Sequence, residues 1–363
     1  MKTTLGLLFG GKSAEHEVSI QSARSIFAAI NKEKYEVVLI GIDKTGNWFL
    51  INKEFMLQDG KVENASLETK PENIIALIPS NNSNQIINVD TKEVIGKLDV
   101  VFSIIHGSFG EDGSLQGFFN VLNIPFVGCD VLASAVGMDK DIAKKLLIEA
   151  NIPVAGYVCC EEFEYDFENY KDDINPLGYP VFVKPANAGS SVGVKKATNE
   201  NELKSAIEYA FKFDSKVIVE EFIKGREIEC SVLGNDDLIV SAPGEIITNY
   251  DFYSYEAKYI DAEGADFKIP AELPQDVIQK IQRLAKQTFK TLCGKGMARV
   301  DMFLTEEGEI FINEINTLPG FTNISMYPKL LELSNIRYTE LIDKLIELGI
   351  EYHKSKQEKE KNF

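Results

Sequence analysis

Long apolar runs, paired cysteines and surplus positive charge are all missing from this 363-residue chain. No apolar run approaches the roughly 18–20 residues that cross a bilayer, and Met1–Phe9 lacks the small-residue cleavage site of a signal peptide, so we expect a cytoplasmic protein with no membrane partner. The five cysteines show no C-x-x-C spacing, which disfavours disulfides and a cysteine-bound metal. Acidic residues outnumber Lys and Arg by 56 to 38, which disfavours nucleic acid as a partner because phosphate contacts need cations.

The residues that are present indicate a globular chain of two or three domains, with 44% hydrophobic and 26% charged content. Strand-type and helix-type patterns alternate over the first 130 residues. This alternation predicts an α/β fold with an N-terminal doubly wound parallel domain, in which ligands bind beyond the carboxyl ends of the strands. We predict domains at 1–130, 131–225 and 226–350, followed by a flexible tail, rich in Lys and Glu, at 351–363.

Periodicity and punctuation also predict individual elements. We expect strands at 3–9, 35–42, 100–105, 125–128, 181–184, 216–221 and 227–233. We expect helices at 19–31, 113–122, 140–150, 202–213, 275–292 and 338–348.

Three oxygen-bearing side chains lie in apolar runs near the end of the third domain: Asp301, Glu314 and Asn316. Residues two apart on a strand point to the same face, so Glu314 and Asn316 project together, and a neighbouring strand could add Asp301. Such oxygen ligands suit Mg²⁺ that is also held by phosphates. Arg299 would supply a cation for a developing anion. The pattern predicts an enzyme that uses a metal-bound nucleotide, although two ordinary edge strands with solvent-facing polar residues would give the same spacing.

A second group of residues predicts a phosphate site. Lys184 ends a strand and is followed by the small-residue loop Gly189–Gly193, whose backbone N–H groups could close over phosphate oxygens. A generic hairpin turn is the alternative. The literal Walker A pattern at residues 6–13 is rejected, because Leu7, Leu8 and Phe9 continue a buried strand where a P-loop needs loop backbone.

Single residues at strand ends have both functional and ordinary interpretations. Glu15 could bind an ammonium group or simply favour the start of a helix. His106 could serve the site or make a structural hydrogen bond. The segment Glu220–Ile223 followed by Glu227 could form a purine slot with a ribose ligand, but many buried strands end in acids. The aromatic stretch 252–259 has the composition of a functional loop.

Taken together, these residues resemble the ATP-grasp superfamily and, within it, the D-alanine–D-alanine ligase family. The resemblance covers nearly the whole chain in family order. It rests on residues 10–19, 106–107, 110–117, 138–140, 184–187, 189–193, 255–259, 298–301 and 313–322.

The resemblance implies a three-domain ATP-grasp fold with ATP between the central and C-terminal domains, and it implies a role for each site residue. The nucleotide would be held by Lys140, Lys184, Ser191, Glu220, Glu221, Phe222, Ile223, Glu227 and Lys258. Two Mg²⁺ or Mn²⁺ ions would be held by Asp301, Glu314 and Asn316. The D-alanine substrates and the reacting atoms would be served by Glu15, His106, Ser190, Tyr259, Arg299, Gly320 and Ser325.

In the implied reaction, the carboxylate of the first D-alanine attacks the γ-phosphate of ATP, and the amine of the second attacks the resulting acyl phosphate. Arg299 and the Gly320 N–H would bind the oxyanion, and Lys258 with Ser325 would contact the second carboxylate. Another ATP-grasp carboxylate–amine ligase, a D-alanine–D-serine ligase and a non-enzymatic ATP-binding module are the alternatives. Tyr259 with Met326 favours D-alanine. The family also implies a homodimer.

Overall fold

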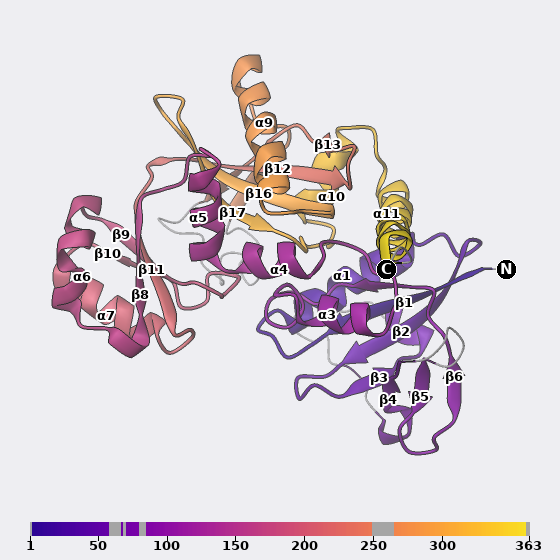
Figure 1. Ribbon diagram of the computed structural model, residues 1–363. Coiled ribbons are helices and arrows are strands. Elements are labelled where there is room, and N and C mark those ends of the chain that lie inside the picture. Colours follow the sequence, from indigo (N-terminus) through magenta and orange to yellow (C-terminus); the bar gives the residue numbers. More distant parts are fainter. Residues whose placement is uncertain (1, 58–66, 68–69, 80–84, 249–264, 361–363) are drawn as a thin grey trace.

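A computed structural model describes residues 2–57, 67, 70–79, 85–248 and 265–360 of the chain. Its described part contains three larger sheets, one in each predicted domain, and a small three-stranded sheet of β4 (Ile75–Leu77), β5 (Ile86–Asn88) and β6 (Val94–Gly96) (Figure 1). The domain boundaries themselves stay a prediction.

The N-terminal sheet has the strand order β3-β2-β1-β7. Strand β1 (Thr3–Gly10) pairs in parallel with β2 (Tyr35–Ile42) and β7 (Val100–Ser103), and β3 (Trp48–Leu50) is antiparallel to β2. Helices α1 (His16–Ala29), α2 (Lys53–Met56) and α3 (Ser114–Val121) accompany this sheet. The strand predicted at 125–128 is reduced to one parallel bridge between Phe126 and Val101.

Strand β1 settles the Walker A question. The strand continues to Gly10, and Leu7, Leu8 and Phe9 within it are fully buried. These residues form the core of the domain, so they cannot also be phosphate-binding loop, and the rejection of that motif is confirmed.

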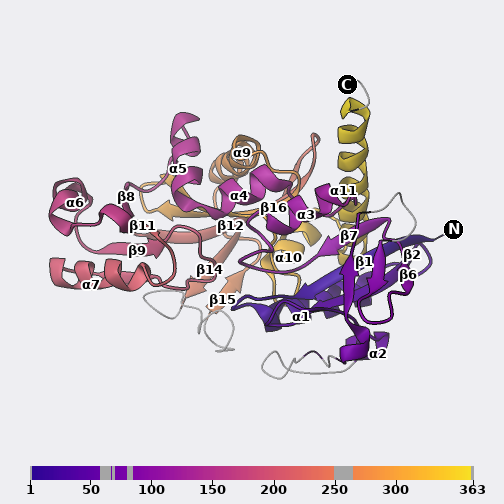
Figure 2. The ribbon, with the colours of Figure 1, turned by 60° about the horizontal axis from the view of Figure 1, so that its bottom comes forward.

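The central sheet is antiparallel, with the order β10-β9-β11-β8. Its strands are β8 (Tyr157–Glu161), β9 (Val181–Pro185), β10 (Lys195–Ala197) and β11 (Lys216–Glu221). The valines of β9 and β11 alternate with other residues, and they pack against α6 (Phe167–Ile174) and α7 (Glu200–Ala210) on one face of the sheet. Because side chains alternate along a strand, Lys184 and Glu220 face the opposite side. Figure 2 shows α5 (Lys140–Glu149) and α7 on opposite sides of this sheet.

The C-terminal sheet is built around two long strands, β12 (Gly225–Gly234) and β16 (Gly296–Thr305). Strand β17 (Ile310–Asn316) lies beside β16, and β14 (Gly244–Thr248) and β15 (Ala265–Lys268) extend the other edge, while β13 (Ile239–Val240) pairs with β12. Helix α9 (Gln275–Thr291) packs on this sheet through an apolar stripe with helical spacing, Ile281, Leu284, Ala285, Thr288 and Phe289. Helix α4 (Val131–Met138) packs near β17.

The last helix corrects the prediction for the end of the chain. Helix α11 (Tyr338–Glu360) follows α10 (Met326–Glu332) and continues well past the predicted end at residue 348, so the predicted flexible tail is wrong as far as Glu360. The extension is held to the N-terminal region, because Lys356 Nζ donates to Asp130 Oδ2 at 2.8 Å and Tyr352 Oη donates to the same oxygen at 3.2 Å.

Within the part of the chain that the structure describes, none of the helices combines the length and apolar character needed to cross a bilayer.

Candidate active site

The acidic wall of the site is one face of the C-terminal sheet. Glu229 on β12 lies opposite Asp301 on β16, which in turn lies opposite Glu314 on β17. Arg299 pairs with Asn316 in the neighbouring row. Residues opposite one another share a face, so the structure brings Asp301, Glu314 and Asn316 together on neighbouring strands as the sequence predicted. We call Glu229, Arg299, Asp301, Glu314 and Asn316 the acidic wall.

Arg299 is the single cation among these acids. Its Nε and Nη2 donate to the two carboxylate oxygens of Asp301, each at 2.7 Å, and its Nε lies 3.1 Å from Glu229 Oε2. Burial opposes the charge of Arg299, but Asp301 and Glu229 outweigh burial and raise its pKa well above the ordinary value. Sequence reasoning missed Glu229. Its spacing from Glu227 on a predicted strand could have placed it on the same face, but only the sheet order puts it beside Arg299.

The donor set of this wall fits a divalent cation held partly by phosphates. Asp301 and Glu314 supply carboxylates, and Asn316 supplies an amide oxygen that accepts a hydrogen bond from Leu318 N at 3.2 Å. Among the described residues, no group of three His, Cys, Asp or Glu side chains has the arrangement of a metal site. Two carboxylates and an amide would hold a Mg²⁺ ion only in part and would leave coordination positions for oxygens from another molecule.

The basic wall of the site combines the central sheet with α5. Lys184 on β9 and Lys144 on α5 both make ion pairs with Glu220 on β11, one to each carboxylate oxygen. Burial alone would raise the pKa of Glu220, but the charges of Lys184 and Lys144 outweigh it and lower the pKa to about 2. We call Lys140, Lys144, Lys184 and Glu220 the basic wall. Lys144 was not predicted, and the side chain of Glu220 faces the two lysines.

The two walls meet where the lysines of the basic wall contact side chains of β17. Lys140 Nζ lies 3.7 Å from Glu314 Oε2 and donates to Ala188 O at 2.7 Å, at the start of the Gly189–Gly193 loop. Lys184 Nζ donates to Asn313 Oδ1 of β17 at 3.3 Å. Residues from α5, β9 and β17, up to about 170 positions apart in the sequence, therefore converge in one place.

The predicted purine segment is only partly arranged as a slot. Glu221 is tied to the sheet, because its Oε1 accepts a hydrogen bond from Gly156 N at 2.5 Å. The Phe222 ring packs against Phe182, with centroids 5.9 Å apart, and is 41% exposed. Ile223 is half-buried between β11 and β12, and Glu227 is half-buried on the face of β12 that carries Glu229. Phe182 was missed, although its alternation with the core valines places it on the Lys184 face.

The N-terminal domain contributes Glu15 and His106. A Cβ added to Gly107 would lie 3.1 Å from Glu15 Oε2, and one added to Gly189 would lie 3.6 Å from the same oxygen. Glu15 thus stands between the loop after β7 and the glycine–serine loop of the central domain. Its side chain makes no capping hydrogen bond to α1, so capping does not explain its position.

His106 is buried behind Glu15. Its Nδ1 lies 3.1 Å from Leu318 O and 3.4 Å from Glu111 Oε1, and its Nε2 lies 3.3 Å from Ser22 Oγ. Burial lowers the pKa of His106, but the hydrogen bond with Glu111 and the charges of Glu15 and Glu111 raise it overall. The contact with Leu318 fixes the loop that leads to Gly320. The described contacts of His106 therefore match the structural hydrogen bond that the sequence left open as one of its two roles.

Two loops have backbone that suits close approach to a ligand. Ser190 and Ser191 adopt left-handed φ values of 51° and 58°, and a Cβ added to Gly193, whose φ is 74°, would come within 2.6 Å of Pro185 Cγ. A Cβ added to Gly320 would lie only 2.8 Å from Ser325 Oγ, so a larger residue cannot stand there without moving Ser325. Ser325 Oγ itself accepts a hydrogen bond from Thr322 N at 2.9 Å. Tyr259 and Lys258 lie outside the described residues.

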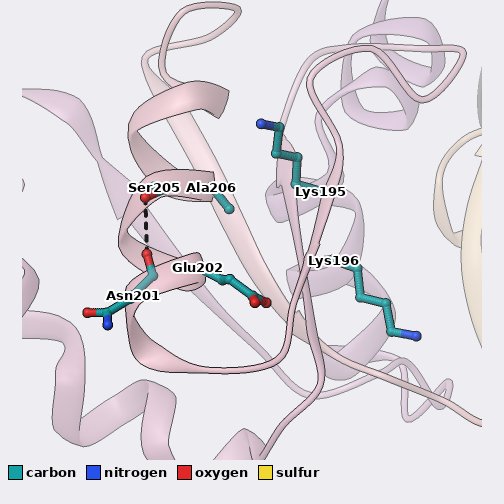
Figure 3. Close-up of a pocket in the computed structure, with 6 residues that line it drawn as sticks. All are labelled: Lys195, Lys196, Asn201, Glu202, Ser205 and Ala206. Carbon is teal, nitrogen blue, oxygen red and sulfur yellow. Dashed lines mark hydrogen bonds between the residues drawn. The ribbon is translucent and has the colours of Figure 1, made fainter.

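A shallow hollow of about 340 Å³ lies elsewhere, between β10 and α7 (Figure 3). It is lined by Lys195, Lys196, Asn201, Glu202, Ser205 and Ala206. Lys195 pairs with Val183 and Lys196 with Phe182, so the two lysines point to opposite faces of the sheet. The hollow shares none of its residues with the two walls, and it adds nothing to the candidate site.

Comparison with known families is consistent with this geometry. A family model described as "D-ala D-ala ligase N-terminus" matches residues 4–129, and one described as "D-ala D-ala ligase C-terminus" matches residues 146–347. A D-alanine–D-alanine ligase of Oceanobacillus iheyensis is 53% identical over 361 residues, covering 99% of this chain and 98% of its own.

Solved structures give the same result. The D-alanine–D-alanine ligase of Coxiella burnetii has a TM-score of 0.85 at 36% identity, covering 98% of this chain and 96% of its own. The VanG D-Ala:D-Ser ligase of Enterococcus faecalis has a TM-score of 0.84 at 40% identity, covering 96% and 100%. A Bacillus anthracis D-alanine–D-alanine ligase solved with ATP has a TM-score of 0.73 at 29% identity, covering 98% and 99%. These likenesses confirm the predicted ATP-grasp fold, and the chain belongs to the D-alanine–D-alanine ligase family.

Proposed function

We propose that this protein joins two D-alanines into D-alanyl-D-alanine at the expense of ATP, for peptidoglycan precursor synthesis. The observation that carries the proposal is the convergence of the two walls. Lys140 and Lys184 lie within 3.7 Å and 3.3 Å of β17 side chains, beside Asp301 and its partner Arg299. A cationic surface next to a carboxylate–amide surface suits a triphosphate accompanied by divalent cations.

The two walls would bind different parts of the metal–ATP complex. Lys140 and Lys184 bind phosphate oxygens, the backbone of the segment Glu220–Ile223 receives the adenine, and Glu227 receives the ribose. Asp301, Glu314 and Asn316 would hold two Mg²⁺ or Mn²⁺ ions, which would neutralise charge on the phosphates. Arg299 holds both oxygens of Asp301, so a bound metal would share this carboxylate with Arg299 or displace it.

The amino-acid end of the site lies toward the N-terminal domain. Glu15 binds the ammonium group of the first D-alanine, and Ser190 and Tyr259 orient Glu15. The carboxylate of the first D-alanine then attacks the γ-phosphate, and ADP leaves. The amine of the second D-alanine attacks the acyl phosphate. Arg299 and the Gly320 N–H stabilise the negatively charged oxygen of the tetrahedral intermediate. The bond between the acyl carbon and the phosphate oxygen then breaks, and inorganic phosphate leaves with the electron pair of that bond and takes up the proton that the attacking amine loses. Ser325 and Lys258 contact the second carboxylate, and the loop around Tyr259 excludes water.

The test is a product analysis with purified protein. With ATP, Mg²⁺ and D-alanine, we expect ADP release and a product with the mass of D-alanyl-D-alanine. L-alanine and bicarbonate should release no ADP. Release of ADP with bicarbonate but not with D-alanine would assign the chain to another type of carboxylate–amine ligase and overturn the proposal.

A D-alanine–D-serine ligase is the second candidate, because the VanG enzyme is 40% identical to this chain. Met326, buried against Gly244 at the start of α10, and Tyr259 favour alanine over serine at the second position. Competition between equal D-alanine and D-serine concentrations, read by mass, decides between them: mainly D-alanyl-D-serine would reverse the assignment.

We also propose that the protein is a cytoplasmic homodimer. Sedimentation equilibrium should give twice the mass of the 363-residue chain. A monomer at micromolar concentration would contradict this part of the proposal without touching the reaction.

A further inference from the structure

The basic wall holds more positive charge than its own acid can neutralise. Glu220 is one carboxylate, and it faces two ammonium groups, those of Lys144 and Lys184. The side chains of Lys144 and Glu220 are each only 3% exposed, and that of Lys184 is 14% exposed. A buried cation without its own counter-ion is costly, so this surplus charge favours an anionic ligand.

The two lysines are not equivalent in their freedom to move. Lys144 lies on α5, its Nζ is 5.5 Å from the centre of the Tyr157 ring, and Tyr157 lies directly opposite Glu220 on β8. Tyr157 Oη in turn donates to Asp141 Oδ1 at 3.1 Å, back on α5. Lys144 is therefore enclosed by α5, β8 and β11. Lys184 stands at the edge of this group and also reaches Asn313 across the site.

Helix geometry points Lys144 and Lys140 to the same side of α5, because residues four apart lie one above the other. Lys140 reaches the Gly189–Gly193 loop and Glu314, and Lys144 reaches Glu220. One helix thus presents a lysine to the place assigned to phosphate and a second lysine to the acid that restrains Lys184.

We propose that Lys144 is a positioning residue for nucleotide binding: it stays paired with Glu220 so that Lys184 can turn from Glu220 to a nucleotide phosphate. Without Lys144, Lys184 is the one counter-ion left to this buried carboxylate among the residues that the structure describes. Moving Lys184 to the phosphate then leaves Glu220 unpaired, and the cost of that unpaired charge is subtracted from the binding of the nucleotide. The inference rests on the proposed function, since it needs a nucleotide phosphate beside Lys184.

The decisive variants are Lys144→Met and the double variant Lys144→Met with Glu220→Gln. Methionine fills the volume of the lysine stem without its charge, and glutamine keeps the shape of Glu220 without needing a counter-ion. Lys145→Met is the matched control, because Lys145 is the next residue of α5 and its side chain is 60% exposed, pairing from the solvent side with the buried carboxylate of Asp141.

Titration calorimetry with ADP measures binding in the full chain. We expect Lys144→Met to bind ADP about tenfold more weakly, the double variant to return to within about threefold of wild type, and Lys145→Met to match wild type. In steady-state assays, Lys144→Met should raise the KM for ATP with kcat nearly unchanged, whereas a general loss of structure lowers kcat as well.

Each result bears on the inference. ADP binding by Lys144→Met within twofold of wild type overturns it, as does weaker binding that the second substitution fails to restore. If Lys144→Met does not fold, as judged by circular dichroism, the double variant decides alone: wild-type affinity supports the inference and a tenfold loss overturns it. Failure of the wild-type protein itself to bind ADP would instead overturn the proposed function.

Discussion

The two walls of the site hold opposite surpluses of charge. The basic wall sets the carboxylate of Glu220 against Lys144 and Lys184, and the acidic wall sets Arg299 against the carboxylates Glu229, Asp301 and Glu314. Each wall buries one group of the minority sign at its centre and pairs it with two neighbours. The comparison teaches that the described side chains of each wall only partly neutralise it, so that in the proposed function phosphates would complete one wall and divalent cations the other.

The largest effect should follow from breaking the acidic wall. Arg299→Ala removes its only cation and the proposed oxyanion donor, and we expect kcat to fall by at least about 10²–10³-fold. Glu314→Ala, which removes a proposed metal ligand, should be equally severe. Coupled ADP-release assays measure both variants, and circular dichroism should show the native fold. Arg283→Ala, on the exposed side of α9, is the control. Near-normal turnover in either variant would refute the roles assigned to this wall.

A smaller effect is expected from neutralising the centre of the basic wall, and it depends on pH. The pKa of Glu220 is lowered from an ordinary 4.5 to about 2 in the folded protein. A carboxyl group whose pKa is lowered by folding stabilises the protein above its unfolded pKa, and this contribution is lost as the pH falls through the folded pKa. Between pH 4.5 and 2 the wild type should therefore lose up to about 3 kcal/mol that Glu220→Gln does not lose.

Urea unfolding at stepped pH measures this contribution. Glu220→Gln should be less stable than wild type at neutral pH, and the difference in the free energy of unfolding should shrink toward pH 2. If the difference in the free energy of unfolding between wild type and Glu220→Gln stays constant from pH 7 to pH 2, the ion pairs of Glu220 contribute no stability.

The smallest effect should come from the margin of the basic wall. Lys196 Nζ lies 5.3 Å from the centre of the Phe222 ring, and both side chains are exposed. A cation–π contact at such a site contributes about 0.5–1 kcal/mol, and only the part of it that changes on nucleotide binding enters the affinity, so Lys196→Met should weaken ADP binding by at most about two- to fivefold. Lys195→Met, on the opposite face of the same strand, should leave it unchanged. A tenfold loss with Lys196→Met would mean that the basic wall extends to the sheet edge.

Sequence reasoning succeeded where the chemistry is local to one or two strands. The E-x-N spacing on β17 and the Arg-x-Asp spacing on β16 fix which side chains share a face, and the register of the two strands places them together. The strand at residues 216–221 and the helices around 140–150 and 275–292 follow from periodicity to within a residue or two.

Sequence reasoning failed where the role of a charged residue depends on a partner from another helix or strand. Helix α5 carries three lysines, Lys140, Lys144 and Lys145, and the order of residues does not show which of them is buried. Glu229 becomes a partner of Arg299 only through the β12–β16 register. The end of α11 was predicted wrongly for the same reason. Its Lys-rich composition suggests a solvated tail, but Lys356 donates a hydrogen bond to Asp130, some 220 residues earlier in the chain.

Helix α11 has a consequence for how the polypeptide is made. Its Leu341, Ile342, Leu345 and Ile346 belong to the same apolar core as Leu7 of β1 and Phe102 of β7. Strand β1 therefore lacks part of its apolar surroundings until the first turns of α11 have been synthesised. The central sheet, with a core of its own, can close earlier. During translation the central sheet should thus become protected before β1, and β1 should stay sensitive to proteases until α11 has been made and packed.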